Sequence, residues 1–273
     1  MLTVNEIIDF FKLNASHAKK ELGQNFLINQ KVVDKIIDEL NINEKDLVLE
    51  IGPGLGALTD TLVKKTEHLT VVEYDSKFVD FLNKSYANKG VTVVKNNIVK
   101  YKDFSATKVA GNLPYYMTTE IVSFVTLEFE RLEKAVFMVQ KECFKRFTAL
   151  KGKDYNAINV VLDYLFEVKE VTTVSKENFF PQPTVESIVF SLTKKDARDM
   201  KFVKLLFKIA KICFSNRRKT IINNLSCVIK EKETLINILK NMGLSLTSRA
   251  EELSVNDFVT LTTSLLNNNL INL

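Results

Sequence analysis

The chain contains 273 residues with a formal net charge of +5, and 46% of them are hydrophobic and 26% charged. This composition is typical of a globular protein with room for one large and one smaller domain. No stretch of transmembrane length is free of charges, which excludes a membrane span. Three isolated cysteines and two distant histidines exclude a disulfide framework and a histidine-based metal site, so we expect no metal.

The N-terminal region predicts a helix, a basic loop and a second helix. Residues 4–13 have apolar residues at helical spacing, and Glu6 and Asp9 within them argue against a secretory signal. We therefore expect a cytoplasmic protein. Lys19 and Lys20 precede a loop at residues 23–27, where their charge fits either a phosphate contact or a solvated segment. Residues 32–40 have the spacing of an amphipathic helix.

A glycine-rich turn follows the first predicted strand. Residues 47–51 predict a buried strand, residues 52–56 read Gly-Pro-Gly-Leu-Gly, and residues 57–65 return to helical spacing. Such a turn lets the backbone approach a ligand and leaves helix N–H groups available to it. Glu50 stands two residues before the first glycine. A carboxylate there would repel a pyrophosphate but favour an ammonium group, so the pattern departs from a dinucleotide site.

Three further strands end in polar residues. The strand at 69–72 leads to Glu73, about 20 residues after the glycines, where a carboxylate can hold a ribose diol. Asp75 suits instead the cap of a helix at 76–86. The strand at 91–94 ends at Asn96 and Asn97, and the strand at 108–111 leads to Asn112. The carboxyl ends of parallel strands share one edge of a sheet, so we expect the ligand crevice there.

The residues Asn112, Leu113, Pro114 and Tyr115 have the parts needed to hold an aromatic amine. The Asn112 side chain and the Leu113 carbonyl can accept hydrogen bonds from an amino group. Pro114 stiffens the backbone and has no N–H of its own, and Tyr115 offers a face on which a base can stack. By itself so short a motif is more often a strand end before a helix, with its tyrosine in the core.

The remaining sequence predicts the rest of the sheet and a helical domain. A helix at 118–129 and a strand at 135–139 precede a helix at 142–150, two strands at about 158–168 and 186–192, and a stiff loop with aromatics between them. After residue 195 the pattern becomes helical, at 202–214, 220–229, 234–242 and 254–266. We therefore predict a domain at residues 1–195 and an all-α domain at 196–273, which carries a basic turn at 216–219.

Several stretches together resemble a known family. Residues 50–56 are similar to the first motif of the S-adenosylmethionine-dependent methyltransferases, and residues 112–115 to the fourth motif of the class that methylates adenine N6. With residues 23–27, 140–142, 180–187, 216–220 and 249–254, the chain resembles the bacterial small-subunit ribosomal RNA adenine dimethyltransferases, the KsgA family, from about residue 17 onward. The resemblance implies a Rossmann-like α/β fold, the seven-stranded class I methyltransferase sheet, with a small all-α C-terminal domain.

The resemblance also implies an activity and a site. The expected reaction transfers methyl groups from S-adenosylmethionine to two adjacent adenosines in the 3′-terminal hairpin of 16S rRNA, within the assembling 30S subunit, and the protein is expected to be a monomer. The expected cofactor-binding residues are Asn25, Leu27, Glu50, Gly52, Gly54, Glu73, Tyr74, Asn97, Ile98 and Asn112. The target adenine is expected at Asn112, Leu113, Pro114, Tyr115 and Phe180. RNA is expected at Lys19, Lys20, Arg146, Arg217, Arg218 and Lys219.

This chain departs from the family pattern at three places. Asn97 stands where the family usually has an Asp, so an uncharged oxygen would meet the cofactor's adenine amine. Asn156 and Ala157 replace a usual Gly-Arg pair, and Thr184 replaces a usual Lys. Two potential phosphate contacts are therefore missing.

Two alternatives remain open on the sequence. One is an Erm-type enzyme that methylates 23S rRNA, although that family usually has Gly-Thr-Gly-Lys-Gly and Asn-Ile-Pro-Tyr at the two motifs. The other is a ribosome-assembly or RNA-binding factor with a vestigial site, against which the intact Glu50, Glu73 and Asn112 argue. A DNA adenine methyltransferase fits less well, because the basic helical tail matches the rRNA family.

Overall fold

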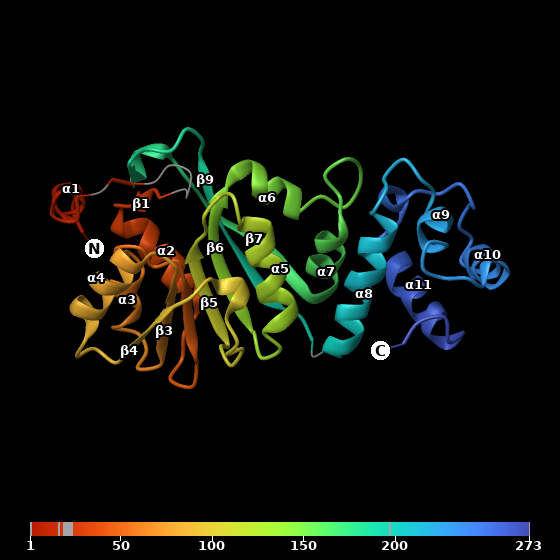
Figure 1. Ribbon diagram of the computed structural model, residues 1–273, viewed down its shortest axis with the longest axis horizontal. Helices are drawn as coiled ribbons and strands as arrows, with labels where there is room; N and C mark the ends of the chain where they lie inside the picture. Colours follow the sequence, from red (N-terminus) through yellow and green to blue (C-terminus); the bar gives the residue numbers. More distant parts are fainter. Residues whose placement is uncertain (1, 16, 19–23, 197, 273) are drawn as a thin grey trace. The chain divides into compact units, whose positions relative to one another are not determined.

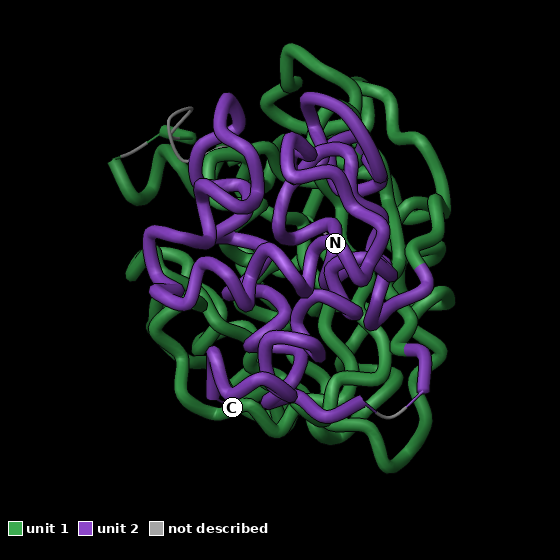
Figure 2. Tube along the Cα trace, turned by 90° about the vertical axis from the view of Figure 1, so that its right-hand side faces the viewer, with its two compact units in different colours: residues 1–144, 168–194 green, residues 145–167, 195–273 purple. Residues whose placement is uncertain are grey.

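The computed structural model describes residues 2–15, 17–18, 24–196 and 198–272. The chain divides into two compact units (Figure 2). The first comprises residues 1–144 and 168–194, and the second residues 145–167 and 195–273. Lys19 and Lys20 lie outside the described residues.

The first unit is built on a seven-stranded sheet in the order β4-β3-β2-β5-β6-β9-β7 (Figure 1). The strands from β4 to β6 pair in parallel, and β9 runs antiparallel to β6. This order places β2 between β3 and β5, so the three predicted motifs leave neighbouring strands at one edge. The strands are β2 (Val48–Ile51), β3 (Leu69–Glu73), β4 (Val91–Lys95), β5 (Lys108–Asn112), β6 (Lys134–Gln140), β7 (Phe166–Val174) and β9 (Ser187–Lys194).

Helices flank this sheet, and several of them begin at a side-chain cap. Helix α2 begins after Asn29, whose side chain accepts from the Lys31 N–H at 2.9 Å, and its apolar stripe is buried in a cluster with alternate residues of the strands. Asp75 caps α4 in the same way, as predicted. The helices are α1 (Val4–Leu13), α2 (Gln30–Leu40), α3 (Thr59–Leu62), α4 (Ser76–Tyr86), α5 (Thr118–Glu128) and α6 (Lys141–Phe147), with short 3₁₀ turns η2 (Ile98–Lys100) and η3 (Lys176–Asn178).

A separate two-stranded ribbon joins segments far apart in the sequence. Strands β1 (Phe26–Leu27) and β8 (Phe179–Phe180) pair antiparallel, with Phe26 opposite Phe180. The sequence indicated only loops at both places, because two-residue strands carry no periodic pattern. The ribbon therefore unites the N-terminal loop with the loop that precedes β9.

The second unit is a helical bundle around its own core. The buried residues of this core include Tyr155, Leu206 and Phe258, and the Tyr155 ring meets the Phe214 and Phe258 rings edge-on at centroid distances of 5.3 and 6.3 Å. Its helices are α7 (Ala157–Leu165), α8 (Met200–Cys213), α9 (Ile221–Leu225), α10 (Lys232–Asn241) and α11 (Val255–Asn267), with a 3₁₀ turn η4 (Ala250–Glu252).

The predicted strand at 158–168 is wrong over most of its length. Residues 157–165 form helix α7, which starts at a capping box between Asn156 and Asn159, and strand β7 begins only at Phe166. Most residues of this run are buried, apolar and often β-branched, and in so short a run helix and strand patterns look alike. The compact units consequently differ from the predicted division at 195/196, since residues 145–167 belong to the helical unit.

Candidate active site

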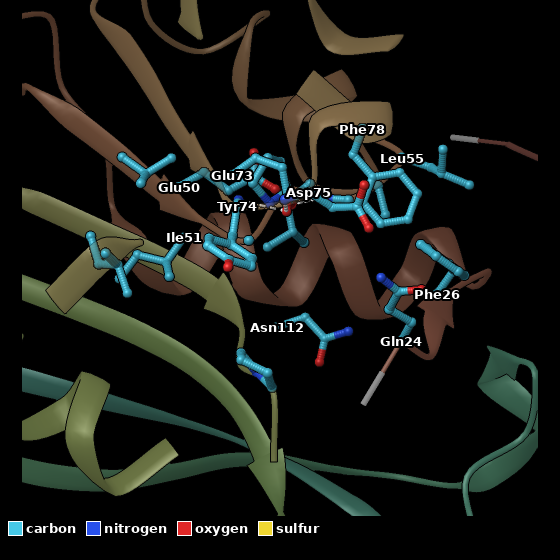
Figure 3. A pocket seen from close by; sticks show the side chains of 18 of the residues that line it. Gln24, Phe26, Glu50, Ile51, Leu55, Glu73, Tyr74, Asp75, Phe78 and Asn112 are labelled. Atoms are coloured by element: carbon cyan, nitrogen blue, oxygen red, sulfur yellow. Dashed lines mark hydrogen bonds between the residues drawn. The ribbon is translucent and has the colours of Figure 1, made fainter. Parts of the chain in front are cut away.

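A cavity of about 430 Å³ lies at the carboxyl ends of β2, β3, β4 and β5. Its size is typical of a site for a nucleoside-sized ligand. In Figure 3, Asn112 projects into the cavity from the end of β5, while Glu73, Tyr74 and Asp75 lie on the far side from it. The open edge of the parallel sheet thus forms the crevice that the strand order predicts.

Residues of the glycine turn line the cavity. Gly52, Gly54 and Gly56 have φ values of +64°, +55° and +80°, in the left-handed region that favours glycine. A Cβ atom built on Gly52 would meet no atom within 4 Å, so the backbone at Gly52 borders open space in the cavity lining. A ligand can therefore approach the main chain directly at this turn.

Glu73 is held by three backbone N–H groups. Its Oε1 accepts from Tyr74 at 2.7 Å and Asp75 at 2.8 Å, and its Oε2 accepts from Gly54 at 3.1 Å. Burial raises the pKa of Glu73, and these donors counteract part of that rise. A carboxylate has about four acceptor positions, so one remains for a ligand hydroxyl. The bonds also tie the acid to the glycine turn.

Glu50 is a buried acid, and among the described residues no cation contributes to its electrostatic surroundings. Its side chain accepts a 2.6 Å hydrogen bond from the Thr59 hydroxyl. Burial, with the nearby charges of Glu73 and Asp60, raises the pKa of Glu50 to about 8. A ligand ammonium group near Glu50 would favour the ionised form and so bind more tightly than a neutral group.

The end of β4 forms a further part of the lining. The Asn97 side chain accepts from the Val99 N–H at 3.2 Å and caps η2. An N–H can only donate, so this bond assigns the amide oxygen to the cap and leaves the amide nitrogen for other partners. An Asp at this position would retain a second acceptor oxygen. Ile98 is buried and Tyr74 is exposed, and both line the cavity.

Asn112 is oriented by the N-terminal loop. Its Nδ2 donates to the Asn25 carbonyl at 3.1 Å. A carbonyl can only accept, so the bond assigns the amide orientation and leaves Oδ1 as the acceptor of the side chain. The predicted role of Asn112 requires an acceptor, and this is the orientation that supplies one.

The other predicted target residues lie beside the cavity. Among the described residues, its lining includes Pro114 but not Leu113, Tyr115 or Phe180. The Tyr115 hydroxyl lies 3.2 Å from the Ser187 hydroxyl. Phe180 packs against the cluster of Ile7, Leu55 and Phe78. Of the residues predicted to hold the target adenine, Asn112 and Pro114 thus line the cavity, whereas Leu113, Tyr115 and Phe180 lie outside its lining.

The predicted RNA-binding residues differ in their surroundings. Arg146, Arg218 and Lys219 are exposed. Arg217 is engaged within the helical unit: its guanidinium pairs with Glu251 at 3.2 Å, donates to the Tyr155 carbonyl and lies over the Phe214 ring. Its substitution would consequently disturb packing as well as any RNA contact.

The two missing basic positions differ in their structural surroundings. Asn156 caps α7, and Ala157 is buried in its first turn. Thr184 is exposed in the loop before β9.

Sequence reasoning missed an apolar wall of the cavity. Leu2 precedes α1 and Ile7 lies within it, while Phe26 comes from β1, Leu55 from the glycine turn and Phe78 from α4. Phe10 of α1 reinforces this wall, with its ring 5.7 Å from that of Phe78. The amphipathic pattern of residues 4–13 was visible in the sequence, but it does not say which surface the helix covers. Tyr116, 58% exposed at the cavity, was missed too.

The described parts of the chain hold neither a cluster of metal ligands nor a membrane-spanning helix. Within those parts, His, Cys, Asp and Glu side chains nowhere gather in groups of three or more that could hold a metal ion. None of the helices described there is both long and apolar enough to cross a membrane.

Comparison with known proteins decides the family. Residues 15–266 match the family described as "Ribosomal RNA adenine dimethylase". The chain belongs to this family. It is 38% identical over 255 residues to the "Ribosomal RNA small subunit methyltransferase A" of Malacoplasma penetrans, covering 91% of this chain and 92% of the relative. The protein of the same name from Natranaerobius thermophilus is 35% identical over 286 residues, covering 94% and 95%.

Solved structures agree on the fold. A dimethyladenosine transferase from Plasmodium falciparum superposes with a TM-score of 0.78 at 23% identity, covering 90% of this chain and 98% of that one. The 23S rRNA methyltransferase ErmE superposes with a TM-score of 0.65 at 22% identity, covering 88% and 99%. The predicted Rossmann-like methyltransferase fold is therefore confirmed.

The family and the cavity together define a methyltransferase of ribosomal RNA that uses S-adenosylmethionine. The residues fit this cofactor. Gly52 leaves open space where a ligand can approach the main chain. Glu73, bound by backbone N–H groups, could accept from the ribose hydroxyls, and the buried acid Glu50 would favour the ammonium group. When bound, the cofactor supplies a methyl group activated by a sulfonium. The chain's own residues then have to position the acceptor nitrogen.

Proposed function

We propose that this protein dimethylates N6 of two adjacent adenosines in the 3′-terminal hairpin of 16S rRNA, on the assembling 30S subunit. The relatives are named as methyltransferases of small-subunit ribosomal RNA, which supports the choice of rRNA. The observation that carries the adenine chemistry is the Asn112 amide, whose nitrogen is bound to the Asn25 carbonyl and whose oxygen is left to accept. We further propose that the protein acts as a monomer in the cytoplasm, without a metal.

The proposed mechanism is one of orientation. The N6 lone pair of adenine is conjugated with the ring and is a poor nucleophile. Asn112 Oδ1 and the Leu113 carbonyl accept from the amine, which draws the nitrogen toward tetrahedral geometry and directs its lone pair at the methyl group. Tyr115 and Phe180 hold the base after it has left its stack. The proton leaves to water after transfer, so no strong base is needed.

The test is methyl transfer to ribosomal subunits. Wild-type protein is incubated with labelled S-adenosylmethionine and unmethylated 30S subunits, with 50S subunits in parallel, and the labelled nucleotides are mapped. We expect label in dimethyladenosine of 16S rRNA alone. Label in 23S rRNA would indicate the Erm-type reaction, and absence of label from both subunits would favour an assembly factor.

Asn112→Ala tests the assigned role of the amide. It removes the acceptor for the target amine while leaving Glu50, Glu73 and the glycine turn in place, so we expect transfer to fall by roughly a hundredfold or more. Calorimetry should give a Kd for S-adenosylhomocysteine within a few-fold of wild type. The control is Asn43→Ala, which removes an asparagine that caps a turn before β2, at the amino end of the sheet. Transfer at the wild-type rate by Asn112→Ala would refute the role.

A further inference from the structure

We propose that Asn29 and Asn178 form a positioning lock that holds the catalytic amide of Asn112 in its acceptor orientation. The proposal rests on the proposed function, because it concerns the group that orients the target amine. Neither asparagine lines the cavity, and both act through the β1–β8 ribbon. We call the set of Asn29, Asn178 and this ribbon the asparagine lock.

The lock begins at the Asn25 carbonyl. This oxygen alone among the described groups is seen to accept from Asn112 Nδ2, at 3.1 Å. Asn25 lies in a loop, directly before the two residues of β1. The position of its carbonyl therefore depends on how firmly β1 is held.

Strand β1 is held by pairing with β8. Phe26 pairs with Phe180 and Leu27 with Phe179, and the Ile28 N–H donates to the Asn178 carbonyl at 2.9 Å. Leu27 and Phe179 are also buried in the core of the sheet unit. A two-residue ribbon has few ladder bonds of its own, so side-chain bonds at its end should help to fix the position of its backbone groups.

Asn178 and Asn29 supply those side-chain bonds. Asn29 Nδ2 donates to Asn178 Oδ1 at 2.6 Å. Asn178 Nδ2 in turn donates to the carbonyl and the hydroxyl of Ser175, at 2.9 Å each. Asn29 Oδ1 accepts from the Lys31 N–H at the start of α2, and α2 is packed into the core of the sheet unit. The ribbon is thus hydrogen-bonded, through Asn29, to the start of α2, a helix packed into the core.

The same loop also borders the cofactor cavity. Asn25, Phe26 and Leu27 all line it. A ligand that contacts this loop should therefore stabilise the hydrogen bond between the Asn25 carbonyl and Asn112. The lock links the ordering of the cofactor wall to the orientation of the acceptor for the target amine.

The main test variant is Asn29→Ser. Serine is as good a helix N-cap as asparagine, so the start of α2 is retained, but the donor to Asn178 is lost. Asn178→Leu removes the other half of the bond, whereas Asn178→Asp keeps an acceptor for Asn29. The matched control is Thr172→Val, which removes the 3.1 Å hydrogen bond from Lys35, a second link between α2 and the strand before the ribbon.

The first measurement separates kcat from KM on 30S subunits. For Asn29→Ser and Asn178→Leu we expect kcat to fall roughly ten- to a hundredfold, as for a misplacement of about 1 Å in a catalytic group. KM for the subunit should change less than threefold, and Asn178→Asp should recover most of the rate. An unchanged kcat in both variants, or an equal loss in Thr172→Val, would overturn the proposal.

The second measurement does not depend on activity. Side-chain amide exchange of ¹⁵N-labelled Asn112, assigned with Asn112→Asp, is followed with and without S-adenosylhomocysteine. We expect faster exchange in Asn29→Ser and partial recovery on ligand binding. Equal exchange in wild type and variant would reject the lock. If wild type transferred no methyl group to rRNA, the proposed function would fail while this measurement would still decide the lock.

Discussion

At the residue scale, Glu50 is an acid whose protonation depends on what the cavity holds. It is buried, and its hydrogen-bond donor, the Thr59 hydroxyl, carries no charge. Burial raises the pKa of Glu50 from an ordinary value of 4.5 to about 8. The folded protein therefore keeps a proton at neutral pH that the unfolded chain would release.

This difference predicts a pH-dependent stability of the ligand-free protein. A folded-state pKa above the unfolded value contributes stability that is complete below pH 4.5 and is lost as the pH rises to about 8. The free energy of unfolding should fall across this window, by at most about 1.4 kcal/mol per pH unit from this group. Glu50→Gln has no such proton, so its urea-unfolding free energy should fall less steeply.

The control for this prediction is Glu44→Gln, which alters an exposed acid before β2. Its profile of unfolding free energy against pH should follow that of wild type. Parallel profiles for wild type and Glu50→Gln between pH 5 and 8 would show that Glu50 ionises normally in the folded protein.

At the element scale, the turn between β2 and α3 uses its glycines for two different purposes. Gly52 and Gly56 both have left-handed backbones. A Cβ on Gly52 would enter open space, whereas a Cβ on Gly56 would lie 2.3 Å from the Tyr86 hydroxyl. That hydroxyl is held by Asp60 at 2.8 Å. Gly56 thus serves the packing of α4 against the turn, and Gly52 serves the cavity.

Alanine at the two positions should separate these purposes. Gly52→Ala should lower the free energy of unfolding by about 1–2 kcal/mol through backbone strain, and should weaken S-adenosylhomocysteine binding. Gly56→Ala adds an overlap and should lower that free energy by about 2–4 kcal/mol. Urea unfolding and calorimetry measure the two effects. A larger loss of stability in Gly52→Ala than in Gly56→Ala would contradict this division.

At the scale of the whole molecule, the substrate rRNA is a large polyanion, and we expect exposed basic residues to contact it. Arg218 and Lys219 are exposed in the turn between α8 and α9, while Arg217 in the same turn is bound to Glu251 and the Tyr155 carbonyl. Three consecutive basic residues therefore divide into one that holds the helical unit and two that are open to solvent.

This division predicts two kinds of variant. Arg218→Ala with Lys219→Ala should leave the thermal midpoint unchanged, weaken binding to 30S subunits, and reduce the slope of log K against log salt by up to about two. Arg217→Ala should instead lower the thermal midpoint, because it leaves Glu251 and a carbonyl without their donor. An unaltered salt slope in the double variant would exclude this turn from the RNA contact.

Much of the molecule follows from local pattern. Residues 32–40 show the helical apolar stripe that is buried in α2, and the strand-turn-helix units place Glu50, Glu73 and Asn112 at one sheet edge because their strands are parallel. The run at 157–165 misled the same reasoning, since most of its residues are buried and apolar and its few polar side chains do not reveal the helical period clearly.

The sequence by itself determined the parallel strands at the centre of the sheet, the glycine turn and the motif residues, because periodicity and turn chemistry act between near neighbours. Only the tertiary structure decided which atom of Asn112 accepts, how Asn29 and Asn178 join the ribbon, and that Arg217 bonds to the Tyr155 carbonyl and Glu251. The physical reason is that these outcomes depend on partners 34 to 149 residues away, and no local pattern specifies such a bond.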